Sequence, residues 1–138
     1  MDLFISSCYT FIGSREGKGA RSTVPDVAEF GIIKGFDKEK DYSEYEPQKY
    51  NCVSIDDDAL NNWWERLEDM KSYFHTYSRP EKALARCGVT LIPPESLDLF
   101  HAIVKDDTQA EYHEQAAAVL SVIEEAKRNG SFVIHFGV

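Results

Sequence analysis

The chain has 138 residues, with 24 acidic side chains against 15 basic ones and a formal net charge of −9. A hydrophobic content of 43% speaks against a disordered chain, and the length predicts one domain over residues 1–138. The longest apolar runs fall short of the roughly 20 residues that cross a bilayer, and the acidic balance argues against direct binding to nucleic acid, whose phosphates need a cationic surface.

The first part of the chain predicts two strands separated by loops. Residues 2–12 are apolar, aromatic and β-branched, which predicts a strand, and the glycine-rich residues 13–22 predict a loop. Residues 24–36 fit either a short strand or a helical turn. The charged, tyrosine-rich residues 37–49 predict a surface loop, and residues 50–55 predict a second strand.

A long amphipathic helix is predicted next. Apolar side chains recur at steps of three and four from Leu60 to Tyr77, which predicts a helix of about 18 residues. The aspartates at 56–58 supply candidates for its N-cap and place negative charge where the helix dipole favours it. Pro80 lies beyond its expected end.

The remaining residues predict two further helices and a terminal strand. The expected elements are a helical turn at 81–87, a short strand at 89–92, helices at 94–104 and 112–128, and a strand at 131–136. This order favours an α+β fold over an alternating α/β fold. We therefore expect a small, mostly antiparallel sheet, built from the N-terminal strands and the C-terminal strand and packed by about three helices.

The negative charge is concentrated in one part of the chain. Residues 1–36 are neutral overall, residues 37–70 carry a net charge of −7, and residues 71–138 carry −2. The densest stretch has only Arg66 against six acids, namely Asp56, Asp57, Asp58, Glu65, Glu68 and Asp69. The preceding loop adds Glu44 and Glu46.

An adjacent pair of tryptophans lies inside this acidic stretch. Neighbouring residues on a helix lie about 100° apart, so Trp63 and Trp64 can both border one apolar face. Core packing accounts for at least one of them, while tryptophan is also a preferred anchor at protein interfaces. The predicted contact surface for a basic protein partner therefore combines Trp64 with Asp56, Asp57, Asp58, Glu65, Glu68, Asp69, Glu44 and Glu46.

The sequence predicts neither a metal nor a cofactor. The aspartates at 56–58 lack the alternating ligands and the glycine of a calcium loop. The glycine-rich stretch at 13–19 has the wrong spacing for a phosphate-binding loop, and no helical pattern follows it.

Cysteine and histidine leave one catalytic alternative open. An odd number of widely spaced cysteines, Cys8, Cys52 and Cys87, predicts reduced thiols in a cytoplasmic protein. A Cys–His nucleophile pair, for example with His135 in the last strand, would make the protein a small hydrolase or transferase. We expect His135 to point to the opposite face of that strand from Ile134 and Phe136.

Three segments resemble a known class of proteins. Residues 79–85 (RPEKALA), 91–97 (LIPPESL) and 134–138 (IHFGV) resemble small bacterial immunity proteins of polymorphic toxin and contact-dependent growth inhibition systems. The resemblance covers roughly residues 50–138, and its motifs are turn, helix-start and terminal-strand elements.

This resemblance implies a non-enzymatic inhibitor that binds and neutralises a cognate toxin domain. Toxins of this class are often nucleases with cationic clefts, which an acidic protein approaches quickly and can block. An acidic adaptor subunit for some other basic partner is the third alternative.

Overall fold

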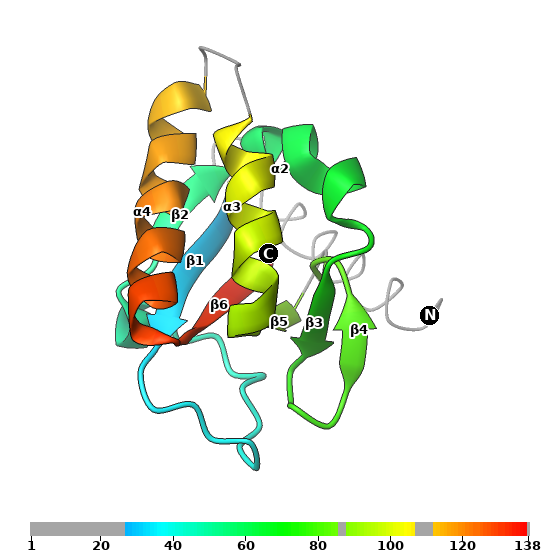
Figure 1. The fold of residues 1–138 in the computed structure, drawn as a ribbon. Coiled ribbons are helices and arrows are strands. Elements are labelled where there is room, and N and C mark those ends of the chain that lie inside the picture. Colours follow the sequence, from blue (N-terminus) through cyan, green and yellow to red (C-terminus); the bar gives the residue numbers. More distant parts are fainter. Residues whose placement is uncertain (1–26, 86–87, 107–111, 138) are drawn as a thin grey trace, which may run out of the picture.

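The computed structural model describes residues 27–85, 88–106 and 112–137. In these residues, six antiparallel strands form one sheet in the order β2-β1-β6-β5-β3-β4 (Figure 1). The strands are β1 (Val27–Ile33), β2 (Val53–Asp56), β3 (Lys71–Phe74), β4 (Pro80–Lys82), β5 (Gly88–Ile92) and β6 (Phe132–Gly137). The helices are α2 (Asp57–Trp64), α3 (Leu97–Lys105) and α4 (His113–Asn129), with 3₁₀ turns η2 (Pro47–Tyr50), η3 (Glu65–Leu67) and η4 (Pro94–Ser96).

The predicted α+β class is confirmed. The three α-helices cover one face of the antiparallel sheet (Figure 1). The strand and loop predicted at 2–12 and 13–22 lie outside the described residues. Within the ambiguous stretch at 24–36, Val27–Ile33 forms strand β1, which lies inside the sheet between β2 and β6.

The predicted 18-residue helix is wrong beyond Leu67. Helix α2 and η3 end there, and the chain turns into β3. In β3, consecutive residues are buried on opposite faces of the sheet: the Ser72 hydroxyl donates to the Ala83 carbonyl at 2.6 Å, while Tyr73 packs on the other side. Neighbouring side chains of a strand point to opposite faces of the sheet. Both Ser72 and Tyr73 can therefore be buried when each face of the sheet is covered.

The helical turn predicted at 81–87 is also wrong in its described part. Residues Pro80–Lys82 form the edge strand β4, paired antiparallel with β3. All three residues are exposed. Proline and charged side chains are typical of a short edge strand, because they discourage pairing with another chain.

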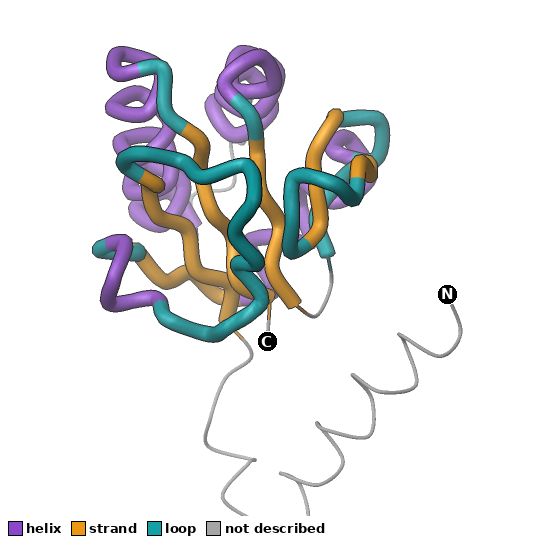
Figure 2. Tube along the Cα trace, turned by 90° about the horizontal axis from the view of Figure 1, so that it is seen from below, coloured by secondary structure: helices purple, strands orange, loops and turns teal. Residues whose placement is uncertain are grey.

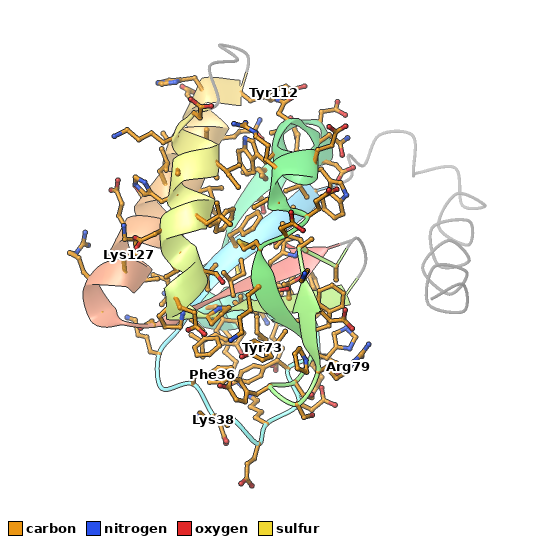
Figure 3. All side chains as sticks on the ribbon, turned by 45° about the vertical axis from the view of Figure 1, so that its right-hand side comes forward. Phe36, Lys38, Tyr73, Arg79, Tyr112 and Lys127 are labelled. Atoms are coloured by element: carbon orange, nitrogen blue, oxygen red, sulfur yellow. The ribbon has the colours of Figure 1, made fainter. Side chains whose placement is uncertain are left out.

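Helix-facing side chains build the larger of two apolar cores. Phe30 of β1 meets Phe100 of α3 with ring centroids 5.7 Å apart. From α2, Leu60 and Trp63 are buried in the same core. The Asp98 carboxylate pairs with Lys127 at 2.7 Å and joins α3 to α4, and Lys127 is visible on α4 in Figure 3.

The opposite face of the sheet is covered by the segment 34–52 (Figure 2). Phe36 stacks on Phe132 at 3.7 Å and on Tyr42 at 5.4 Å, and Tyr42 is only 4% exposed. The Lys38 ammonium lies 5.2 Å from the centroid of the Tyr77 ring, at the same end of the molecule as Phe36 (Figure 3). The loop predicted at 37–49 is therefore partly a packing segment.

Candidate partner-binding surface

Helix α2 and η3 form one continuous helical segment with two unlike faces. Buried side chains, Leu60, Trp63 and Leu67 among them, fix it to the core. Acidic residues at helical spacing occupy the exposed side. We call this set the acidic ridge, and it consists of Asp58, Glu65, Glu68 and Asp69. Asp58 lies on α2, Glu65 lies on η3, and Glu68 and Asp69 lie in the turn that follows, so these four predicted contact residues come from one short stretch next to the buried Trp63 and Leu67.

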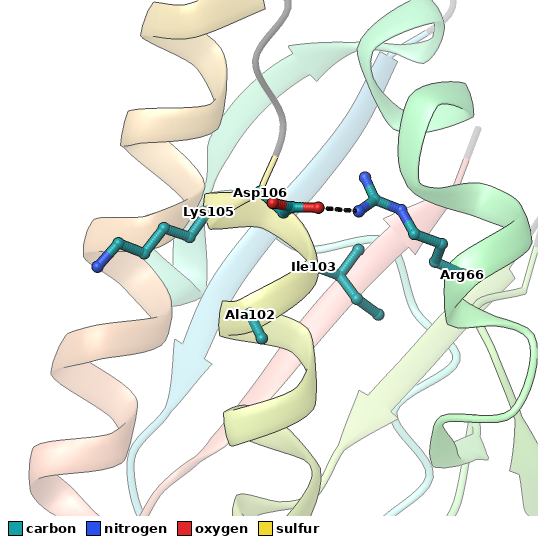
Figure 4. A pocket seen from close by; sticks show the side chains of 5 residues that line it. All are labelled: Arg66, Ala102, Ile103, Lys105 and Asp106. Carbon is teal, nitrogen blue, oxygen red and sulfur yellow. Dashed lines mark hydrogen bonds and ion pairs between the residues drawn. The ribbon is translucent and has the colours of Figure 1, made fainter.

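The carboxylates of the acidic ridge have no counter-ion in the described part of the chain. Among the residues that the structure describes, no cation forms an ion pair with any of its four carboxylates. Arg66 follows Glu65 directly in the sequence, but its guanidinium points across to α3 and bonds to the Asp106 carboxylate at 3.0 Å (Figure 4). Arg66 therefore does not pair with the ridge, although it lies between Glu65 and Glu68 in the sequence.

The two tryptophans differ in their exposure. Trp63 is fully buried, whereas Trp64 is half-buried and packs against the edge of the larger core. Only Trp64 keeps part of its surface within reach of a partner. It follows Trp63 on α2 and immediately precedes Glu65, so it borders the acidic ridge.

Asp56 and Asp57 are less accessible than the ridge. The backbone N–H of Asp56 donates to the Gln115 Oε1 at 2.6 Å, and its carboxylate accepts from the Gln115 Nε2 at 3.1 Å. Asp56 is the N-cap residue of α2, but its side chain makes no capping hydrogen bond. Asp56 thus ties β2 to α4. Asp57 is half-buried in the first turn of α2.

Glu44 and Glu46 are separated from the ridge by the sheet. They belong to the segment that covers the face opposite the helices, where the neighbouring Tyr45 ring contacts Phe136 at a centroid distance of 5.4 Å. The Tyr45 hydroxyl donates to the buried carboxylate of Glu29. The structure therefore does not join these two glutamates to the ridge in a single surface.

A shallow groove beside the ridge was not predicted from the sequence. It lies between η3 and α3, has a volume of about 640 Å³, and is lined by Arg66, Ala102, Ile103, Lys105 and Asp106 (Figure 4). About one turn earlier on α3, Leu99 is 45% exposed. The apolar stripe predicted for this helix consists of Leu97, Phe100, Ile103 and Val104. Leu99 lies outside that stripe and does not line the groove.

Cys52 does not support the alternative hypothesis of a Cys–His nucleophile pair. Burial, with a smaller contribution from the Glu29 carboxylate, raises the pKa of the Cys52 thiol to about 12. A reactive cysteine needs a lowered pKa. His135 lies on the face of the sheet opposite Ile134 and Phe136, as predicted, and packs against Phe30, whereas Cys52 packs with the core that contains Ile134 and Phe136. Cys8 and Cys87 lie outside the described residues.

Two further properties concern the described residues only. They contain no group of three or more His, Cys, Asp or Glu side chains placed to hold a metal ion. Within the same ranges, every helix is too short or too polar to cross a membrane.

Comparisons with known proteins give no relative. No family model, no curated protein and no solved structure matches this chain.

Proposed function

We propose that this protein is a cytoplasmic immunity protein that binds a basic toxin domain through the acidic ridge and neutralises it. The observation that carries this proposal is the set of four exposed carboxylates on α2, η3 and the turn that follows, with the cation next to Glu65, Arg66, bonded to Asp106. A concentrated negative field steers a cationic partner toward the correct face and raises the association rate.

The way in which the ridge is held supports a binding role. Trp63 and Leu67 are both 0% exposed, so the segment that carries the ridge is fixed to the core before any partner arrives. A surface that is ordered in advance loses little conformational entropy on binding. Trp64 adds an amphipathic side chain of the kind found at interface hot spots.

Neutralisation follows from charge alone. A nuclease holds the phosphates of its substrate in a cationic cleft, because those phosphates dominate its affinity for nucleic acid. Carboxylates seated in or beside that cleft compete with the phosphates for the same cations. The inhibitor then needs no chemistry of its own, and the resemblance in residues 79–85, 91–97 and 134–138 favours this role over an adaptor subunit.

The test is a growth-protection experiment. The protein domain encoded by the reading frame directly upstream is expressed as the candidate toxin from an inducible promoter, with and without this protein. We expect growth to stop with the toxin alone and to continue when both are present. The purified pair should also form a complex on size-exclusion chromatography. Absence of both protection and complex formation would overturn the proposal.

A further inference from the structure

A second cavity lies at the edge of the sheet, where β1 runs on past its partner strand β2. The pairing of β1 with β2 ends at Phe30, opposite Val53, whereas β1 stays paired with β6 as far as Ile33. Helix α4 packs over β1 and β2 (Figure 1), and η2 leads into β2 beside the last residues of β1. The space left between these three elements is called the edge pocket here, and its lining includes Ile32, Lys34, Lys49, Asn51, Val122 and Glu125.

The edge pocket has the size and composition of a site for a small molecule. Its volume of about 410 Å³ lies within the roughly 300–1,000 Å³ typical of ligand pockets, and it is more enclosed than the groove between η3 and α3. Ile32 and Val122 both belong to or pack against the larger core, and they supply the apolar part of the lining. Apolar surface with a few polar groups around it is the usual make-up of such sites.

Charges of both signs line the edge pocket without pairing with each other. The Lys34 ammonium and the Glu125 carboxylate form no ion pair or hydrogen bond with any residue that the structure describes, and neither does the Asn51 amide. Lys49 lies 3.7 Å from the Glu46 carboxylate, but both side chains are partly exposed, so this pair is weak and exchangeable. The hydrogen-bonding capacity of the charged groups in the pocket is therefore largely unused.

We infer that the edge pocket binds a free α-amino acid with an apolar side chain of about the size of leucine. The carboxylate of the ligand meets Lys34 and Lys49, its ammonium group meets Glu125, and its side chain lies against the apolar part of the lining. A zwitterion whose two charges sit on neighbouring atoms bridges opposite charges that are too far apart to pair directly. A longer peptide is excluded, because its terminal charges are further from each other.

The surplus of one cation in the lining predicts an order of affinities. Two ammonium groups face one carboxylate, so the ligand carboxylate contributes more than the ligand ammonium. The inference goes beyond the proposed function, since none of the residues of the acidic ridge lines this pocket.

The test compares three ligands of the same carbon skeleton, titrated into the full chain and followed by NMR. L-leucine carries both charges, 4-methylpentanoate lacks the ammonium group, and 3-methylbutylamine lacks the carboxylate. We expect L-leucine to shift the backbone amides of Ile32, Asn51 and Val122 saturably. Each analogue should bind at least about tenfold more weakly, because it loses a charge-assisted hydrogen bond, and the amine should be the weakest. Equal affinities for L-leucine and 4-methylpentanoate would overturn the inference, and so would the lack of any saturable shift with L-leucine.

Two variants assign the charges of the ligand to their partners. Glu125→Gln keeps the shape of the side chain and should weaken L-leucine at least about tenfold without weakening 4-methylpentanoate. Lys34→Gln should weaken both of these ligands. The matched controls are Glu114→Gln on the same helix and Lys82→Gln on β4 at the other edge of the sheet, which remove the same charges from exposed positions outside the pocket.

The controls should bind all three ligands as the wild type does. Unchanged binding of L-leucine by a folded Glu125→Gln protein, or the same loss in Glu114→Gln, would overturn the inference. These titrations use the chain without any partner, so their outcome does not depend on the growth-protection experiment.

Discussion

A histidine buried in the sheet should make the stability of this protein depend on pH. His135 of β6 is 0% exposed, and its ring lies 4.8 Å from that of Phe30. The Nδ1 atom is 3.1 Å from the Thr90 hydroxyl, and Nε2 has no hydrogen-bond partner among the described residues. Burial alone lowers the pKa of His135 from 6.5 to about 3. The folded state therefore keeps the imidazole neutral under all mild conditions.

The size of the effect follows from the difference between the pKa of His135 in the folded state and its pKa in the unfolded state. In the unfolded chain, His135 regains its ordinary pKa near 6.5 and binds a proton as the pH falls below that value. Because the folded state does not bind this proton until the pH approaches 3, stability is lost from pH 6.5 downward. Between pH 7.5 and 5.5 the statistical weight of the unfolded state rises about tenfold through this group, which lowers the free energy of unfolding by about 1.4 kcal/mol.

The assay compares wild type with His135→Gln, whose amide can still bond to Thr90 but does not titrate. Urea unfolding at pH 7.5 and 5.5 gives the change in the free energy of unfolding for each protein. We expect the wild type to lose about 1.4 kcal/mol more than the variant, since all other titrating groups cancel in the comparison. Equal losses would refute the reasoning. So would NMR evidence of a protonated His135 ring in the folded protein at pH 5.5.

Three further predictions concern the described core. Iodoacetamide should modify Cys52 slowly at pH 8 in the folded protein and quickly in urea, as peptide mapping by mass spectrometry will show, because the pKa of its thiol is raised to about 12. Gly31→Ala should lower the free energy of unfolding by about 1–3 kcal/mol, since a Cβ atom would meet the Cys52 Sγ and the Tyr50 carbonyl, each at 2.7 Å. Gln115→Ala removes both hydrogen bonds to Asp56 and should cost about 1–3 kcal/mol in the same urea assay, whereas a loss near zero would make this contact dispensable.

Local patterns in the sequence were enough to predict the acidic ridge. Asp58, Glu65 and Glu68 follow one another at helical spacing, and the buried residues between them carry the apolar period. The helix prediction was wrong beyond Leu67. Met70 and Tyr77 continue the helical spacing of apolar residues, so the sequence pattern gave no sign that the helix ends. Pairing of β3 with β4 and β5 overrides that local preference, and single-sequence patterns do not contain such long-range contacts.

The groove and the hydrogen bonds of Asp56 depend on contacts between distant parts of the chain. Arg66 meets Asp106 from 40 residues away, and Asp56 meets Gln115 from 59. No spacing rule reaches across such separations. The sequence analysis assigned Glu44 to the same contact surface as the ridge because both lie in the acidic part of the chain. In the structure, Glu44 belongs to the segment on the opposite face of the sheet.

The most direct test of the account is the association rate with the toxin domain as a function of ionic strength. The ridge variant Glu65→Lys with Glu68→Lys is compared with the control Glu39→Lys with Glu44→Lys, and each changes the net charge from −9 to −5. All four side chains are exposed. We expect the ridge variant to associate roughly three- to tenfold more slowly than the control at low salt and to lose most of its salt dependence. Equal association rates for the two variants would contradict the assignment of partner binding to the acidic ridge.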